Sequence, residues 1–261
     1  TKSMKLTNKL TGLVTAAGLS LATGSASAAI TVVGQAQANY DRASTLNHTI
    51  DASAADKLVV VVTGQHGFNN AAGKVNSLTY DGAALTEASY RSAVTSGTDT
   101  LYHGIFYLDN PATSTGLISA SVANRGHMAI FLLTGTEPGV GATAVSGNGT
   151  RTVDLTTTGS NSMVFFSQGL GGAGNTGQVS GITADSGAIL SSERDPSNWT
   201  GHVVANETIT TAGLETFAFT GGNVTGGMVV ATEFLEAAAV PEPSSALLGL
   251  GGLALLLRRR R

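Results

Sequence analysis

The chain has 261 residues, a formal net charge of −3 and only 12% charged residues. A charge this small, with no basic domain, excludes the electrostatic signature of a nucleic-acid-binding protein, and the absence of cysteine excludes disulfide bonds and thiolate metal sites. A hydrophobic content of 42% is enough for a packed core, and the many Gly, Ser and Thr residues favour strands and turns over helices.

Residues 1–28 are predicted to be a secretory signal peptide. A positively charged start precedes a weakly apolar run from Leu10 to Ala22, and the segment closes on Ala26 and Ala28 in an A-x-A pattern. We therefore expect signal peptidase to release a mature chain that begins at Ala29. A buried N-terminal helix is the alternative interpretation, but charge, apolar run and small residues stand in the order that export requires.

Residues 29–237 are predicted to form an all-β domain, a single antiparallel β-sandwich of the jelly-roll kind, because no stretch in them sustains a helical period. The continuous β-branched run Lys57–Thr63 is typical of a strand buried on both faces. Ser77–Tyr80 and Ala83–Thr86 flank Asp81-Gly82, a pair that supplies the positive φ angles of a type I′ hairpin turn.

Nine further segments have strand character, with Gly, Asn, Ser or Pro in most of the gaps between them. They are Thr100–Leu108, Leu117–Val122, His127–Thr134, Thr152–Thr156, Met163–Gln168, Gln178–Ile182, His202–Ile209, Glu215–Thr220 and Gly227–Phe234. Many short strands at close spacing indicate a sandwich or a barrel. The two halves of the domain resemble each other weakly, but no period is sharp enough to identify repeats, so the sequence predicts one sandwich.

Without its two ends, the chain has a different charge balance. The segment between them carries 7 basic and 16 acidic residues, a net charge of −9. We expect such an acidic exported domain to stay soluble, to repel other anions and to attract divalent cations.

Four segments of this domain carry a resemblance to known proteins. They are Lys57–Val62, Leu78–Thr86, Ile105–Pro111 and Gly227–Phe234. Their order resembles that of a β-sandwich domain which recurs in exported bacterial proteins. The shared motifs are strands and turns, so the resemblance implies the fold and no biochemical activity.

Motifs for catalysis are weak. Gly169–Gly174 matches the G-x-G-x-x-G pattern of dinucleotide-binding loops, but no helix is predicted after it, which favours a flexible loop. His103 and His127 would come together if their strands were neighbours, although strand-end histidines that bond backbone groups are the more frequent alternative. No nucleophile motif and no carboxylate pair at catalytic spacing is present, so we predict that the chain is not an enzyme.

Two kinds of ligand remain open. Asp185, Glu193 and Asp195, together with Asn198, are predicted in or near turns, where oxygen ligands for Ca²⁺ could converge; solvated turn carboxylates are the favoured alternative. Trp199 is the single tryptophan and is a candidate contact for a carbohydrate, with a packing role as the favoured alternative. No other cofactor is predicted.

The end of the chain, residues 238–261, is organised in three parts. The first part consists of Val240, Pro241, Glu242, Pro243 and Ser244. Its two prolines interrupt any helix and place the glutamate on a stiff, extended segment. We expect this segment to be accessible to an enzyme outside the inner membrane.

An apolar run from Ala246 to Leu257 forms the second part. Twelve helical residues span about 18 Å, whereas the hydrocarbon of a bilayer is about 30 Å thick, so we expect a short helix that crosses the inner membrane only transiently. The third part is a basic cluster of Arg258, Arg259, Arg260 and Arg261. This cluster is expected to stay in the cytoplasm and to stop translocation there.

In order and position, this tail resembles the PEP-CTERM sorting signal of Gram-negative bacteria, from Val240 to Arg261. The resemblance implies recognition by an exosortase, a membrane-embedded transpeptidase-like enzyme, and removal of the tail. It also implies a source that makes extracellular polysaccharide. An ordinary tail anchor is the alternative, which the short apolar run and the terminal arginines disfavour.

These features predict a non-enzymatic exported protein of the cell surface or extracellular matrix, with a structural or adhesive role in a biofilm. Its expected partners are signal peptidase, an exosortase and extracellular polysaccharide, and nucleic acid is excluded. A carbohydrate- or calcium-dependent binding module is the alternative, and a hydrolase on a jelly-roll scaffold is less favoured.

Overall fold

The computed structural model describes residues 29–41, 45–66, 75–96, 99–111, 114–122, 125–171, 179–194, 200–222 and 227–238. The regular structure in these ranges consists of β-strands in antiparallel sheets, which confirms the predicted all-β fold class. The predicted signal helix and C-terminal helix lie outside the described residues. Within the described ranges, we find no helix with the length and apolar character needed to cross a membrane.

The first half of the domain contains two sheets. Its strands are β1 (Thr31–Asp41), β2 (Thr45–Asp51), β3 (Lys57–His66), β4 (Val75–Tyr80), β5 (Ala83–Ala84), β6 (Thr86–Ser96), β7 (Asp99–Asp109), β8 (Thr115–Val122) and β9 (Arg125–Thr134). The inner sheet has the order β1-β9-β3-β7-β6, and the outer sheet has the order β2-β8-β4-β5.

The second half also contains two sheets. Its strands are β10 (Thr143–Val145), β11 (Thr152–Thr156), β12 (Ser162–Gly171), β13 (Ile182–Ala184), β14 (Ala188–Arg194), β15 (Thr200–Ile209), β16 (Leu214–Gly221) and β17 (Met228–Phe234). The inner sheet has the order β10-β17-β12-β15-β14, and the outer sheet has the order β11-β16-β13.

The two halves share one topology. If β10 to β13 are matched to β1 to β4, and β14 to β17 to β6 to β9, the strand orders of both inner sheets and both outer sheets coincide, with only the short β5 left over. The domain is therefore a tandem repeat of one sandwich topology within a single compact unit. The amino-acid sequences of the two halves resemble each other only weakly, because two segments can keep one topology while their side chains diverge.

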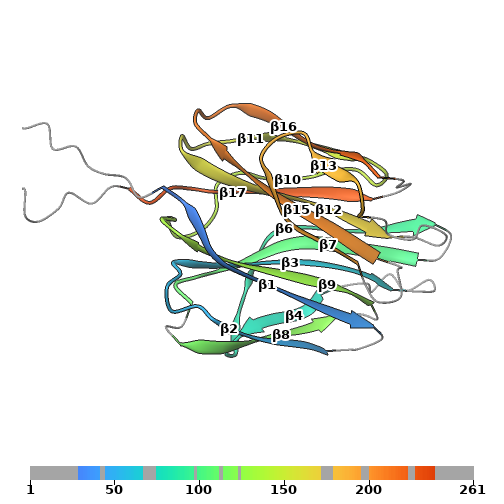
Figure 1. Cartoon of the computed structure of the whole chain (residues 1–261), viewed down its shortest axis with the longest axis horizontal. Helices are drawn as coiled ribbons and strands as arrows, with labels where there is room; N and C mark the ends of the chain where they lie inside the picture. Colours follow the sequence, from blue (N-terminus) through green and yellow to red (C-terminus); the bar gives the residue numbers. More distant parts are fainter. Residues whose placement is uncertain are drawn as a thin grey trace, which may run out of the picture. The chain divides into compact units, whose positions relative to one another are not determined.

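The four sheets lie in layers, with the two inner sheets facing each other (Figure 1). β15 packs on β9 as β17 packs on β7, and β15 packs on β3 as β12 packs on β7. These matched contacts are those expected if an approximate two-fold axis relates the halves. The inner interface thus has the organisation of an isologous homodimer contact, built within one chain.

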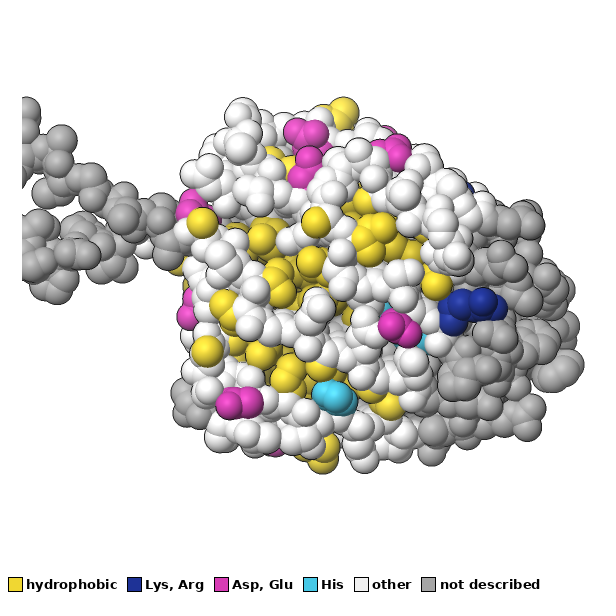
Figure 2. Space-filling model, in the orientation of Figure 1, with side chains coloured by type: hydrophobic (Ala, Val, Ile, Leu, Met, Phe, Trp, Pro, Cys, Tyr) yellow, Lys and Arg dark blue, Asp and Glu magenta, His cyan; other side chains and the backbone are white. Residues whose placement is uncertain are grey.

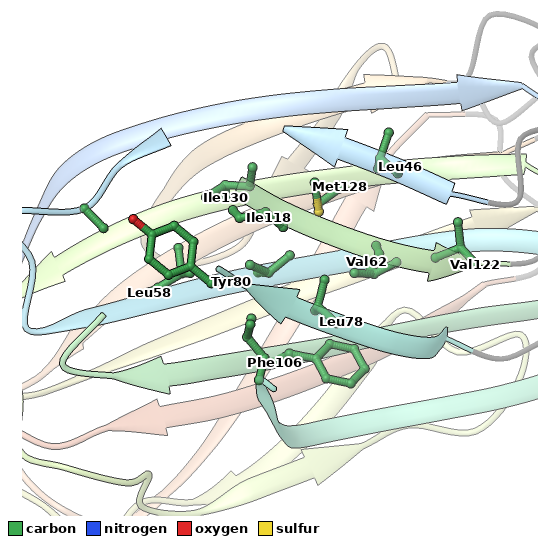
Figure 3. Close-up of a cluster of buried hydrophobic side chains, with 14 of the residues drawn as sticks. Leu46, Leu58, Val62, Leu78, Tyr80, Phe106, Ile118, Val122, Met128 and Ile130 are labelled. Atoms are coloured by element: carbon green, nitrogen blue, oxygen red, sulfur yellow. The ribbon is translucent and has the colours of Figure 1, made fainter. Parts of the chain in front are cut away.

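Three apolar layers hold the sheets together. In β3, Leu58, Val60 and Val62 face the first outer sheet, whereas Val59 and Val61 face the second half. This alternation explains the continuous apolar run, since the strand is buried on both faces as predicted. Figure 3 shows the first outer layer, where Leu58 and Val62 lie across from Leu78 and other side chains of the outer sheet.

The predicted hairpin is confirmed. Asp81 and Gly82 have φ angles of 47° and 82°, as a type I′ turn requires, and they join β4 to β5. One predicted boundary is wrong: the segment Gln178–Ile182 was expected to be a strand, but β13 begins at Ile182, after a turn in which the Ile182 amide donates to the Val179 carbonyl.

Candidate functional site

Several predicted site residues lie outside the described residues. Among them are Ala26 and Ala28 of the cleavage site, Asp195, Trp199, and the whole tail from Val240 to Arg261. Ala29, the expected first residue of the mature chain, is exposed and stands just before β1. Signal cleavage and a carbohydrate contact at Trp199 therefore stay predictions.

The predicted calcium ligands that can be placed do not form a metal site. Asp185 follows β13 on the surface and accepts a hydrogen bond from the Thr220 hydroxyl at 3.1 Å. Glu193 lies on β14, opposite His202 of β15. In the part of the chain that the structure describes, no group of three or more His, Cys, Asp or Glu residues could hold a metal ion.

The glycine motif begins inside a strand. Gly169 and Gly171 belong to β12, which lies against the inner sheet of the first half. A Cβ atom on Gly169 would approach His103 Cγ to 2.6 Å, and one on Gly171 would approach Leu101 Cδ1 to 2.9 Å. These glycines make room for side chains of β7, so their role in the fold is close packing between the two halves.

Three buried histidines meet where the halves face each other. His103 on β7 and His127 on β9 both flank Thr63 of β3 in register, so the three side chains stand in one row. His202 on β15 comes from the opposite sheet, and its ring lies 5.3 Å from that of His127, edge to face. All three histidines are fully buried. The strands of His103 and His127 are not neighbours, because β3 lies between them, so the condition for the predicted pair is not met. The ring that contacts His127 is that of His202, which the first-half strands alone could not reveal.

Each histidine also links the two halves through a hydrogen bond or a ring contact. His103 Nε2 lies 3.0 Å from the Ser167 carbonyl of β12, and its Nδ1 bonds the Thr63 hydroxyl. His127 Nε2 lies 3.0 Å from the Thr200 carbonyl. His202 Nε2 lies 3.0 Å from the Ser191 hydroxyl, which also accepts from the first half. These bonds support the backbone-bonded alternative for His103 and His127.

Burial favours the uncharged form of His103 and His202. It lowers the pKa of His103 to about 4, against the opposing effect of its backbone hydrogen bonds. It also lowers the pKa of His202 well below the ordinary value, and the nearby His127 and His103 add to that shift. The three side chains thus form a polar seam in an otherwise apolar interface.

We expect acid to weaken the fold through this seam. Unfolded histidine binds a proton near pH 6.5, whereas native His103 does so only near pH 4, so the unfolded state binds more protons between these values. His103 alone should remove about 3 kcal/mol from the free energy of unfolding as the pH falls across that window. Urea unfolding of wild type and His103→Gln at about pH 7 and about pH 4.5 measures this loss.

His103→Gln should lose less stability between the two pH values than wild type. His48→Gln is the matched control, because His48 lies on the outer strand β2 and is only half-buried. Equal losses for wild type and His103→Gln would show that the buried ring does not cause the acid sensitivity.

A second polar cluster fixes residues 135–142, the linker between β9 of the first half and β10 of the second half. Lys57 is fully buried, and its ammonium bonds Asp109 and, at 2.5 Å, the Gly139 carbonyl. Asp109 in turn accepts from the Gly139 amide at 2.7 Å, and Tyr107 and Phe234 lie beside the ammonium. The linker is therefore held by charged groups from β3 and β7.

Glu233 of β17 anchors the other side of the linker. Its buried carboxylate accepts the amides of Ala142, Thr158 and Gly159 at 2.9–3.0 Å, and also the hydroxyls of Thr158 and Ser162. Burial acts to raise the pKa of Glu233, but these bonds outweigh it and hold the pKa below its usual value.

Comparison with known proteins identifies the tail. Residues 239–261 match the PEP-CTERM protein-sorting motif. No curated protein and no solved structure matches the chain. The PEP-CTERM motif implies an exosortase as processing partner and membrane-associated sorting of an exported protein in Gram-negative-type bacteria. The predicted resemblance of the tail to this sorting signal is thereby confirmed.

Proposed function

We propose that this exported protein is a non-enzymatic structural module of the cell surface or extracellular matrix. The observation that carries the proposal is the PEP-CTERM motif at residues 239–261, which follows directly on the two-sandwich domain. An exosortase would remove the motif after transient retention in the inner membrane and so release the domain to the exterior.

The interior of the domain supports a scaffold role. The His103 and Glu233 side chains and the Lys57–Asp109 ion pair each connect segments that are far apart in the chain. These buried groups are engaged in joining sheets and fixing the linker between the halves. Such groups give a domain rigidity, which suits a protein whose task is to hold a shape.

The test compares the location and the mass of wild-type and variant proteins in the native host. Wild-type protein from the native host should lie outside the inner membrane, with a mass that places its end between Val240 and Ser244. The double variant Pro241→Ala/Glu242→Ala should keep its arginine cluster and stay in the inner membrane. Glu236→Ala, a carboxylate just before the motif, is the matched control and should be sorted as wild type.

The role is tested in cells that lack the protein. They should form a less cohesive matrix, and wild type but not the unsorted double variant should restore it. An unchanged matrix would contradict the structural role. New reducing ends after purified protein is incubated with matrix polysaccharide would contradict the non-enzymatic assignment.

A further inference from the structure

Lys57 and Asp109 meet at an enclosed place where β3 begins. Asp and Glu side chains lie at several places on the surface in Figure 2, as is usual for charged groups, whereas the Lys57 side chain is fully buried. Lys57 is the first residue of β3 and stands directly opposite Asp109, the last residue of β7. Its Nζ atom is in contact with Asp109 Oδ1, so an amine and a carboxyl group touch inside the fold.

The surroundings of this contact keep water away from the amine. The Lys57 Nζ atom lies 4.9 Å from the centre of the Tyr107 ring and 5.7 Å from that of the Phe234 ring. Burial lowers the pKa of Lys57 below its ordinary value, although the neighbouring carboxylates oppose this effect. The uncharged amine, which is the nucleophilic form of lysine, is therefore formed more readily here than on the surface.

The backbone of Gly139 bonds both of these groups. Its carbonyl accepts a hydrogen bond from Lys57 Nζ at 2.5 Å, which orients the amine. Its amide donates to Asp109 Oδ2 at 2.7 Å, where negative charge develops if the carboxyl carbon is attacked. The Asp109 side chain is 27% exposed, so a water molecule released from it can leave the site.

We propose that Lys57 and Asp109 join in an intramolecular isopeptide bond after the domain has folded. The ammonium first passes one proton to Asp109 Oδ1. The lone pair of the amine nitrogen then forms a bond to Asp109 Cγ, which gives a tetrahedral intermediate with its negative charge on Oδ2. The Cγ–Oδ1 bond breaks, and Oδ1 keeps the electron pair and leaves as water with a second proton from Nζ. One proton stays on the nitrogen, so an ion pair becomes one amide and one water, with no oxidant or other reactant.

The site favours this product over the ion pair. A buried ion pair carries a desolvation cost that a neutral amide avoids. The fold holds the two groups in contact, which replaces a bimolecular encounter by an intramolecular step. Gly139 still offers an acceptor for the new N–H group and a donor for the new carbonyl oxygen.

The bond would also have a use in this chain. It would link positions 52 residues apart in a protein that has no cysteine. A covalent cross-link restricts the unfolded chain and so stabilises the folded state, as disulfide bonds do in many exported proteins. The inference concerns the domain itself and does not depend on where the protein is sorted.

The test is the intact mass and the peptide map of mature protein purified from its native host. The intact mass should be lower than that of the processed sequence by one water molecule. Trypsin cuts after free lysine and arginine, so an unlinked chain gives residues 43–57, 58–74 and 92–125 as separate peptides. The linked chain should instead give residues 43–74, uncut at Lys57, joined to residues 92–125 with the loss of one water.

Three variants serve as controls. Lys57→Met and Asp109→Ala should each keep the full mass of their sequence, because each lacks one partner. Comparisons among variants that lack a partner therefore report on the charges alone. Asp56→Ala removes a different carboxylate, one that accepts the Gly135 amide, and this variant should still lose one water.

The wild-type peptide map decides the inference even if a variant fails to fold. A free 43–57 peptide as the main product, after folded wild type has stood for several days at neutral pH, would overturn it. A loss of water that persists in both Lys57→Met and Asp109→Ala would assign the loss to another group and would overturn it too. A correctly sorted but unlinked protein would refute this inference and leave the proposed function standing, whereas a linked protein retained in the inner membrane would do the reverse.

Discussion

Replacing Glu233 by Gln is expected to lower the free energy of unfolding by about 4 kcal/mol, because the new amide group points a donor at other donors. The carboxylate accepts hydrogen bonds from three backbone amides, those of Ala142, Thr158 and Gly159. The substitution leaves at least one of these N–H groups without an acceptor beside the buried side chain. Urea unfolding at neutral pH, followed by circular dichroism, measures the change.

The control for this variant is Glu215→Gln, which makes the same charge change on β16, away from the linker. It should alter stability by less than about 0.5 kcal/mol. Since the pKa of Glu233 is lowered in the native state, its contribution is present above the ordinary pKa near 4.5 and is lost as the pH falls further. A Glu233→Gln protein as stable as the control would show that the carboxylate does not anchor the linker.

Removing Asp109 should cost more than removing its partner Lys57. Asp109→Ala leaves a buried ammonium with only the Gly139 carbonyl, at a cost of about 3 kcal/mol. Lys57→Met removes the buried charge and leaves a carboxylate that is 27% exposed and still accepts the Gly139 amide. We expect that change to cost about 1 kcal/mol.

The double variant completes the comparison. Lys57→Met/Asp109→Ala should be more stable than Asp109→Ala, because it no longer buries an unpaired charge. Burial lowers the pKa of Lys57 and Asp109 opposes that effect, so in Asp109→Ala the lysine should lose its proton more readily. Stability of that variant should recover as the pH rises toward the ordinary lysine pKa of 10.5. Equal costs for the two single variants would contradict this account.

The strands that the sequence predicted correctly are those with dense apolar residues or a strong turn. β3 has a continuous valine run, and the β4–β5 hairpin has Asp81-Gly82. The missed strands are β1, β2, β6, β10 and β14. β6 is rich in Ser and Thr and forms the edge of its sheet, and β1 presents alanines and a glycine to its neighbours. Edge strands bury little apolar surface, so their hydrophobic pattern is weak.

The histidine seam was only half predictable. Alternation along each strand placed His103 and His127 on one face of the sheet, but their strands are separated by β3, whose Thr63 stands between the two histidines. His202 could not be added, because it reaches His127 only when the second half folds back onto the first. That arrangement depends on tertiary packing of two sheets, which a local pattern does not encode.

The sorting tail was predictable for the opposite reason. Its signal is read as a linear string of residues, so the order of Pro-Glu-Pro, apolar run and arginines is enough. The polar cluster at the linker could not be predicted from the sequence. Lys57 and Asp109 are 52 positions apart, and nothing in their local sequence links them to Gly139.

Because a short linker joins the two sandwiches, their association is an intramolecular event with a fixed effective concentration. If an exported domain is released and diluted, a dimer held by the same partly polar interface would separate. Covalent fusion removes that dependence, so each copy keeps both halves together however far it diffuses. The duplicated architecture can therefore tolerate buried histidines at its centre, where a freely dissociating pair would need a more apolar contact.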